Sequence, residues 1–417
     1  MQLVKDRPSE LLIRPGGNDH QVIADLLAPG GARIADGRPV ISRLVLDAHS
    51  LSRRSLFVEA AAAAGIPCFV DPLTHLLQGD LRPEDKWVGL PFGRAKAMVA
   101  PDFSTDSARD ELVAAVVDFE VEAGATAVIP PYLYLTDPTD PWLPVALDLI
   151  SRTASYMREA GIRLPILPVF CGQLQSFGNP KNWAEGIDRW TTAARQVGAD
   201  QAALCLSPTG AADDTYHRVL RLFEATRRVL ESGIRVISWR QGIYGPALTT
   251  IGAHGYETGI GISEQTRITD NIASRKPKPD GRPRRGGAVP GIYLEPIGRS
   301  VTTTVAAALL GDMRMRPKVM CDDEACCPNG PQDTLDHRRE HAIRSRVKAL
   351  SALDSMPQPA WRLQRVARDA RAAATLITQA NQILAANSID DRIKEQSSAS
   401  LAMVAEYFLA DATQATG

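Results

Sequence analysis

The amino-acid sequence predicts a (β/α)8 barrel followed by a cysteine-rich metal-binding segment and a helical tail. From about residue 40 to about residue 262, short apolar runs alternate with longer amphipathic segments, which is the rhythm of an α/β protein. The apolar runs are continuous, as expected of parallel strands that are buried on both faces. An open doubly wound sheet has the same rhythm, but no glycine-rich phosphate-binding loop follows the first run. Seven or eight evenly spaced units therefore favour the closed barrel.

The expected strands are the apolar runs themselves. They cover residues 44–47, 68–71, 126–130, 166–170, 202–207, 235–239, 255–261 and 291–295. Helical patterns lie at residues 110–122, 142–160, 183–197, 216–230 and 302–310. Four helices are followed by Gly124, Gly161, Gly198 and Gly233, where a left-handed C-cap would release the chain into the next strand.

The chain divides into three expected parts. Residues 1–312 form the barrel, residues 313–350 form the metal-binding segment, and residues 351–417 form the helical tail. An Ala-rich, charged helical pattern runs from about residue 336 to about residue 412, with a break near Pro357 and Pro359. A helix of this kind could pack against a second copy of the chain or against another protein.

The composition is that of an ordinary globular protein. Among 417 residues, 44% are hydrophobic and 23% are charged, with a formal net charge of −1. This balance argues against a general nucleic-acid-binding surface and leaves only a local basic patch for such contacts. The N-terminus lacks the apolar core of a signal peptide, and no apolar run is long enough to span a membrane. We therefore expect a cytoplasmic protein without a membrane segment.

Three cysteines that crowd together predict a metal site. Cys321, Cys326 and Cys327 occupy a polar, turn-forming segment, and His337 and His341 follow at the start of a helical stretch. Three thiolates and one imidazole satisfy a tetrahedral, structural Zn²⁺, and we expect His341 to be the fourth ligand. The alternative is that the thiols are reduced and buried and that the histidines are exposed.

Polar residues at the ends of the expected strands predict an active site, because the carboxyl ends of barrel strands line the catalytic face. Asp71 and Glu257 are the candidate catalytic residues, since an unpaired carboxylate at the end of an apolar run would be costly. The alternative for Asp71 is a turn shaped by Pro72. The candidate substrate-binding residues are Tyr132, Gln173, Ser207, Arg240 and Gln241. Asp47, His49 and His75 also lie at strand ends, and Asp47 could instead cap a helix.

A basic stretch rich in Pro and Gly interrupts the pattern after residue 261. We expect a surface loop that is either simply solvated or in contact with phosphate groups. Its cationic candidates are Arg275, Lys276, Lys278, Arg282, Arg284 and Arg285.

In the order of these features the chain resembles the tRNA-guanine transglycosylase family over about residues 60–345. The family's aspartate segment is similar to Cys68-Phe-Val-Asp71-Pro-Leu-Thr, and its base-binding segment is similar to Phe170-Cys-Gly-Gln173. The strand that carries its nucleophile is similar to Gly255-Tyr-Glu257-Thr-Gly. The middle-strand aspartate of the family is replaced by Pro130-Pro131-Tyr132, and the cysteine spacing differs.

This resemblance implies exchange of a purine or 7-deazapurine base at a glycosidic bond of tRNA or DNA. Glu257 would be the nucleophile, Asp71 the general acid and base, and Gln173 the reader of a modified base, with the basic stretch on the nucleic-acid backbone. Two alternatives stay open. One is a non-catalytic barrel that binds nucleic acid or a protein, and the other is an unrelated barrel enzyme that acts on a small molecule.

Overall fold

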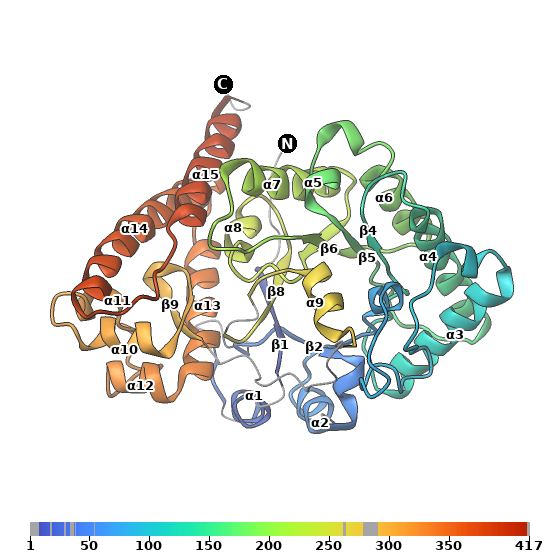
Figure 1. Cartoon of the computed structure of the whole chain (residues 1–417), viewed down its shortest axis with the longest axis horizontal. Coiled ribbons are helices and arrows are strands. Elements are labelled where there is room, and N and C mark those ends of the chain that lie inside the picture. Colours follow the sequence, from blue (N-terminus) through green and yellow to red (C-terminus); the bar gives the residue numbers. More distant parts are fainter. Residues whose placement is uncertain are drawn as a thin grey trace.

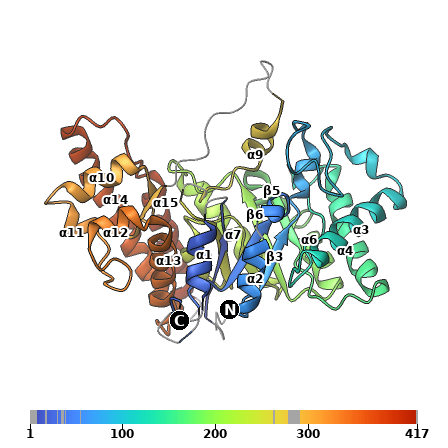
Figure 2. The same cartoon turned by 90° about the horizontal axis from the view of Figure 1, so that it is seen from below.

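The structure is a computed structural model that describes residues 8–16, 19–28, 31–33, 37, 39–53, 55–261, 264–277 and 291–414. In this part of the chain, eight parallel strands with helices between them form a (β/α)8 barrel, as the sequence predicts. The C-terminal helices gather on one side of the barrel, opposite α3 and α4 (Figures 1 and 2). The fold-class prediction is therefore confirmed.

The barrel strands follow the order β3-β2-β1-β8-β7-β6-β5-β4. Their bounds are β1 Glu10–Arg14, β2 Arg43–Asp47, β3 Cys68–Asp71, β4 Tyr134–Leu135, β5 Val169–Gln173, β6 Gln201–Ser207, β7 Arg235–Ser238 and β8 Gly255–Gly259. Residues 126–129 join the two ends of this sheet, because the Thr126 N–H donates to the Cys68 carbonyl (2.8 Å) and Val128 forms a parallel bridge with Ile166. The strands thus close into a ring.

The expected strand at 126–130 lies in the barrel wall but is not regular. Pro130 and Pro131 lack N–H groups for a ladder. The N–H of Ile129 donates instead to the buried carboxyl of Glu120 (2.8 Å). Regular pairing resumes at β4, which begins four residues after the end of the expected strand.

Strand side chains alternate between the inside of the ring and the helices outside it. Leu12, Val45, Phe69 and Ile237 share one apolar cluster within the ring. Their neighbours along the strands, such as Leu11, Leu44 and Val70, belong to the two clusters under the helices. Burial on both faces accounts for the continuous apolar runs in the sequence.

The barrel helices are α1 His20–Leu27, α2 Ser55–Ala63, α3 Asp106–Glu122, α4 Trp142–Glu159, α5 Leu174–Phe177, α6 Ile187–Gln196, α7 Tyr216–Glu231, α8 Gly245–Thr250 and α9 Ile268–Arg275. Four of them, α3, α4, α6 and α7, lie where the sequence pattern predicts them, and the others were not predicted. The four expected C-cap glycines are left-handed, for example Gly124 (φ 76°) and Gly161 (φ 69°). A side chain at these positions would be strained, so they are suited to glycine.

The C-terminal part consists of a small hairpin and six helices. Its elements are β9 Ile292–Leu294, β10 Arg299–Val301, α10 Thr303–Gly311, α11 Arg316–Val319, α12 Pro331–Asp336, α13 Arg338–Asp354, α14 Pro359–Ala386 and α15 Gln396–Gln414. Helix α13 packs against β1 and α1, and α15 packs against α7. On that second contact Phe223 and Phe408 place their rings 5.6 Å apart, and Arg227 pairs with Asp411 (2.8 Å).

Two expectations about the strands are wrong. The run at 291–295 is not a barrel strand, because β9 turns back at Gly298 (φ 75°) and pairs antiparallel with β10. The missing barrel strand is β1, which pairs with both β2 and β8. Among the described residues, no helix is both long enough and apolar enough to cross a lipid bilayer.

Candidate active site and metal centre

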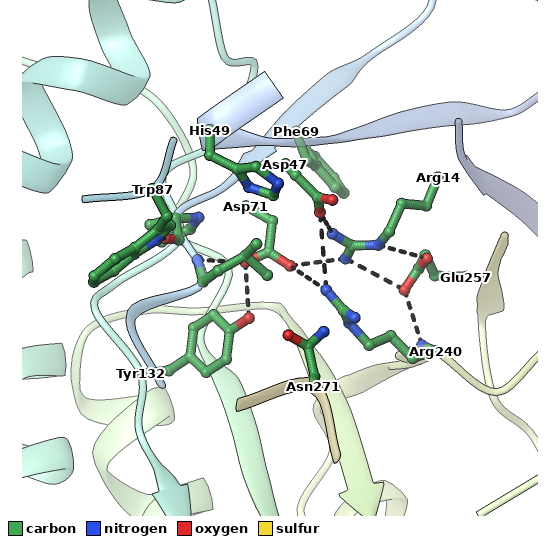
Figure 3. Close-up of polar contacts among 12 residues, drawn as sticks. Arg14, Asp47, His49, Phe69, Asp71, Trp87, Tyr132, Arg240, Glu257 and Asn271 are labelled. Atoms are coloured by element: carbon green, nitrogen blue, oxygen red, sulfur yellow. Dashed lines mark hydrogen bonds and ion pairs between the residues drawn. The ribbon is translucent and has the colours of Figure 1, made fainter. Parts of the chain in front are cut away.

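Charged side chains from separate strand ends meet on one arginine. Arg14 ends β1, Asp47 ends β2, Asp71 ends β3, Glu257 lies in β8, and Arg240 follows β7. The carboxyl ends of these parallel strands share one face of the ring, which brings residues distant in sequence to one place. Figure 3 shows the guanidinium groups of Arg14 and Arg240 side by side among the three carboxylates. We call these five residues the mouth cluster.

Arg14 binds all three carboxylates at once. Its Nε donates to Glu257 Oε1 (2.9 Å), its Nη2 to Asp71 Oδ2 (2.7 Å), and its Nη1 to Asp47 Oδ1. The guanidinium also lies 5.4 Å from the ring centre of Trp239, which is a cation–π contact. The planar fork of arginine is suited to holding several carboxylates in fixed directions.

The carboxylate of Asp71 is held in its charged form. Burial raises the pKa of Asp71, but the charges of Arg14 and Arg240 outweigh burial and hold this pKa below its ordinary value. Its Oδ1 also accepts from the Tyr132 hydroxyl (2.8 Å) and from the Leu73 N–H (3.0 Å). Burial and the charge of Asp71 raise the pKa of Tyr132, so this phenol keeps its proton and stays a donor.

The three carboxylates differ in access to solvent. Asp71 and Glu257 are 0% and 1% exposed, whereas the side chain of Asp47 is 21% exposed. Glu257 is further tied down because its Oε2 accepts the backbone N–H of Arg240 (2.9 Å). Asp47 is therefore the most exposed of the three carboxylates in the mouth cluster.

Arg240 is strained and its guanidinium is incompletely bonded. Its φ is 58°, a left-handed value that costs a non-glycine residue about 1–2 kcal/mol. Its Nη2 lies 3.8 Å from Asp47 and 3.7 Å from Asp71, and within the described residues its buried Nε has no hydrogen-bond partner. Strain of this kind concentrates at functional sites. Arg240 thus has donors available for a ligand.

A neutral histidine lies beside this arginine. His75 is fully buried in the single-turn segment Thr74–Gln78, and its ring centre is 5.5 Å from that of Tyr132. Burial and the charge of Arg240 lower the pKa of His75 to about 3. Neither ring nitrogen has a hydrogen-bond partner in the described part of the chain. A polar ligand would satisfy such groups.

Helix α9 covers the mouth of the barrel, as the two whole-chain views show (Figures 1 and 2). Ile268 joins the apolar cluster inside the ring, and its N–H donates to Ser207 Oγ (3.0 Å). At the other end of the helix, Arg275 pairs with Asp85 (2.8 Å) and lies 3.2 Å from His49 Nε2. A molecule that binds the mouth cluster is therefore enclosed by α9.

The structure brings together four of the candidate site residues: Asp71, Glu257, Tyr132 and Arg240. The other three lie elsewhere. Ser207 anchors α9, Gln241 bonds the Thr209 hydroxyl and the Leu206 carbonyl within the wall, and Gln173 accepts from Ser176 (3.2 Å).

The cationic residues of the basic stretch also do not all lie at the mouth of the barrel. Arg275 faces the mouth, Lys276 is exposed, and Lys278, Arg282, Arg284 and Arg285 lie outside the described residues.

Sequence reasoning missed Arg14, the centre of the cluster. The signal was the run Leu11-Leu12-Ile13 followed by Arg14 and Pro15, an apolar strand that ends in a charged residue and a turn. Asp47 and His75 were noted as strand-end residues but not selected. Asn271 on α9 was also missed, and its side chain lies near Arg240 and Tyr132 in Figure 3.

The predicted cysteine cluster is assembled in the structure. The ligand atoms of Cys321, Cys326, Cys327 and His341 all lie within 4.8 Å of one another. His341 Nε2 is 2.9 Å from the Tyr293 carbonyl, so this nitrogen carries the proton and Nδ1 presents its lone pair to the sulfurs. His337 is 63% exposed and points to Asp333 instead. The four residues form a site that could hold a metal ion.

A surface hollow of about 730 Å³ lies away from both sites. It is lined by the ends of α4 and α6, including Met157, Arg158 and Gln196. Those helix ends lead into the starts of β5 and β6, so the hollow is on the face of the barrel that serves stability rather than catalysis.

Comparisons with known proteins reveal no relative in sequence. No family model matches the chain, and no curated protein matches it. Among solved structures, the carboxyl transferase domain of Rhizobium etli pyruvate carboxylase is 12% identical with a TM-score of 0.36, covering 97% of this chain and 61% of that one. An endo-β-1,4-mannanase from Thermotoga petrophila is 11% identical with a TM-score of 0.38, covering 62% and 69%. Similarity this low carries no information on substrate or reaction.

These findings correct the expected kinship with the tRNA-guanine transglycosylase family. That expectation is wrong: no model of this or any other family matches the sequence, and no curated protein matches it. The roles that rested on the resemblance, base exchange and a nucleic-acid substrate, lose their support. The mouth cluster has to be interpreted from its own chemistry.

Proposed function

We propose that the protein is a barrel enzyme that carries out proton transfer on a small organic carboxylate at the mouth cluster. The observation that carries this proposal is the meeting of three carboxylates on Arg14, beside a strained Arg240 with unused donors. A cluster that served stability alone would not need so many buried charges, because apolar replacements of buried ion pairs are often equally stable. The arrangement thus favours function over packing.

Arg240 is the proposed anchor for the substrate carboxylate. An arginine fork binds a planar carboxylate through two parallel hydrogen bonds. His75 is near Arg240 and Arg275, and the charges of both arginines contribute to lowering its pKa, which supports a positive potential on that side of the mouth. A carboxylate carries a single charge and so repels Asp47, Asp71 and Glu257 less than a phosphate does. We therefore favour a carboxylate over a phosphate substrate.

Asp47 is the proposed proton acceptor. Arg240 Nη2 lies 3.8 Å from Asp47 Oδ1, so the carbon or hydroxyl next to a carboxylate held by Arg240 would face Asp47. A positioned general base typically accelerates such a step by about 10²–10⁴. The Arg14 guanidinium balances the charge on Asp47 as the proton moves. Asp71 and Glu257, which the sequence singled out, are in this proposal positioning residues that fix Arg14.

Binding of 2-oxobutyrate, which carries a single carboxylate, tests the anchor. We expect 2-oxobutyrate to bind the full-length protein and the Arg240→Met variant to lose at least tenfold in affinity by calorimetric titration. Arg235→Met is the matched control, because Arg235 begins β7 at the end opposite to Arg240 and pairs with Asp200. Equal affinity for 2-oxobutyrate in all three proteins would contradict the proposal.

For the cysteine cluster we propose a structural Zn²⁺. Tetrahedral zinc with bonds of about 2.3 Å to sulfur and about 2.0 Å to nitrogen requires sulfur–sulfur separations of about 3.8 Å and sulfur–nitrogen separations of about 3.5 Å. The Cys326 and Cys327 sulfurs are 3.8 Å apart and lie 3.5 and 3.6 Å from His341 Nδ1. Four protein ligands leave no open position, so the ion would hold the loop between α11 and α12 to α13 rather than take part in the reaction.

Metal analysis with a matched histidine pair tests this assignment. We expect one zinc per chain, a marked loss of bound zinc and of thermal stability in His341→Ala, and neither change in His337→Ala. Cobalt substitution should give the absorption bands of a tetrahedral thiolate site. Zinc retained in full by His341→Ala would remove this histidine from the ligand set.

A further inference from the structure

A second buried arginine lies where the C-terminal part of the chain meets the barrel. Arg299 of β10 is 5% exposed and reaches the first turn of α15, where its Nη2 donates to the Ser397 hydroxyl. The N–H of Ser397 donates to the Ala212 carbonyl in the loop after β6 (3.2 Å). Arg299 therefore lies between the hairpin, the tail helix and a barrel loop.

The guanidinium of Arg299 is poorly satisfied. Within the described residues its Nε and Nη1 are buried and have no hydrogen-bond partner. These two nitrogens carry three N–H donors. Buried donors of this kind are rare in folded proteins, and each calls for a water, an ion or a ligand.

The nearby carboxylate does not neutralise Arg299. Asp214 accepts from the Gly210 N–H (2.8 Å) and the Tyr244 hydroxyl (3.0 Å) on one oxygen, and from Arg218 (2.9 Å) on the other. Its acceptors are thus largely in use, and among the described residues no acidic group lies within salt-bridge distance of Arg299. The cluster of Asp214, Arg218 and Arg299 carries one excess positive charge.

Water could satisfy the three donors but would not balance the charge. A buried cation is tolerated when an opposite charge accompanies it, because removing a lone ion from water is very unfavourable. The first N–H groups of α15, at Ser397, Ser398 and Ala399, already donate to backbone carbonyls, so the start of this helix contributes through its dipole, which favours anions. The charge and the donors together fit an oxyanion.

We propose that Arg299 and the first turn of α15 form a binding site for a small inorganic oxyanion of the phosphate or sulfate type. This site is separate from the mouth cluster and does not depend on the function proposed there. Because Arg299 is almost fully enclosed, we assign the free ion rather than a phosphate group on a larger molecule. The bound ion would fasten the tail helix to the barrel loop at residues 209–214.

Urea unfolding of the full-length protein tests the site. The comparison is between phosphate-free buffer and sodium phosphate, with sodium chloride matching the ionic strength. We expect phosphate at ten times its dissociation constant to lower the unfolding equilibrium constant about tenfold. Arg299→Met should lose this response, whereas Arg240→Met should keep it, which separates this site from the mouth cluster.

The measurement in phosphate-free buffer shows whether Arg299 stabilises the protein by binding an ion or by its own packing. Without phosphate, Arg299→Met should be at least as stable as the wild-type protein, because the substitution removes an unbalanced buried charge. Should Arg299→Met fail to fold, Ser397→Ala is expected to weaken the phosphate response several-fold.

Three results would overturn the proposal: a phosphate response that survives in Arg299→Met, a loss of stability in that variant that is equal in both buffers, or an unchanged response in Ser397→Ala. Glycerol 3-phosphate should stabilise the protein much less than phosphate does. An equal or larger effect would overturn the assignment to the free ion.

Discussion

Replacing Arg14 by methionine should invert the contribution of Asp71 to the dependence of stability on pH. In the wild-type protein Arg14 offsets the charges of Asp47, Asp71 and Glu257, and it is itself only 9% exposed. Breaking a buried ion pair by removing one partner costs about 3–5 kcal/mol, which is a large part of the about 5–15 kcal/mol that stabilises a typical protein. We expect a loss of that size at pH 7.

The sign of the pH effect follows from Asp71. In the wild-type protein its pKa is lowered, so the ionised group contributes stability that is present above its unfolded pKa of about 3.9 and is lost as the pH falls through the native value. Without Arg14, burial raises this pKa, and the charged carboxylate then destabilises the native state at neutral pH. The Arg14→Met variant should therefore gain more stability between pH 7 and pH 5 than the wild-type protein does, because the raised pKa of Glu120 acts equally in both proteins.

Urea unfolding followed by tryptophan fluorescence from pH 5 to pH 8 measures both effects. Arg43→Met is the matched control, because Arg43 begins β2 at the other end of the barrel and, among the described residues, forms its ion pair with the single carboxylate of Glu10 (2.6 Å). This control should lose less stability and show no inversion. If Arg14→Met lies within about 1 kcal/mol of the wild-type protein at every pH, Arg14 is not the electrostatic centre of the site.

Two further predictions concern α9 and the irregular strand. Gly79→Ala should destabilise the packing of α9, because a Cβ at this position would lie 2.2 Å from a methyl carbon of Ile272. We expect faster hydrogen exchange in residues 268–275 with little change in melting temperature. Unchanged exchange would contradict this prediction. Glu120→Gln should be more stable than the wild-type protein at pH 7. Burial raises the pKa of Glu120, so its neutral form is favoured in the native state and stability is lost as the pH rises. The advantage of the glutamine should shrink toward pH 4, and an advantage that grows instead would be inconsistent with this reasoning.

Much of the fold could be predicted because short apolar runs and helical periodicity in the sequence locate most strands and several helices. The strand at 68–71 is found with the predicted bounds, since a short apolar run between turn signals is enough to locate a buried strand. β1 was missed because no amphipathic helical pattern was recognised around it. The run at 291–295 was misplaced for the opposite reason: an apolar run looks the same whether it pairs within the ring or in a hairpin outside it.

The candidate sites show the same division between local and long-range information. Cys321, Cys326, Cys327 and His341 are close in sequence, so their spacing alone predicted the cluster that the structure assembles. Arg14 and Glu257 are 243 residues apart, and no sequence pattern states that one bonds the other. Residues joined only through the closure of the barrel could be nominated singly from the sequence, but their grouping around Arg14 could not.

Hydrogen–deuterium exchange into small carboxylic acids tests the central claim most directly. The protein is incubated in D2O with 2-oxobutyrate, and nuclear magnetic resonance records deuterium entering the C–H next to the carbonyl. We predict exchange with the wild-type protein that is at least about 100-fold faster than with Asp47→Asn, as removal of a general base requires. Exchange at the same rate in both proteins would contradict catalysis at the mouth cluster.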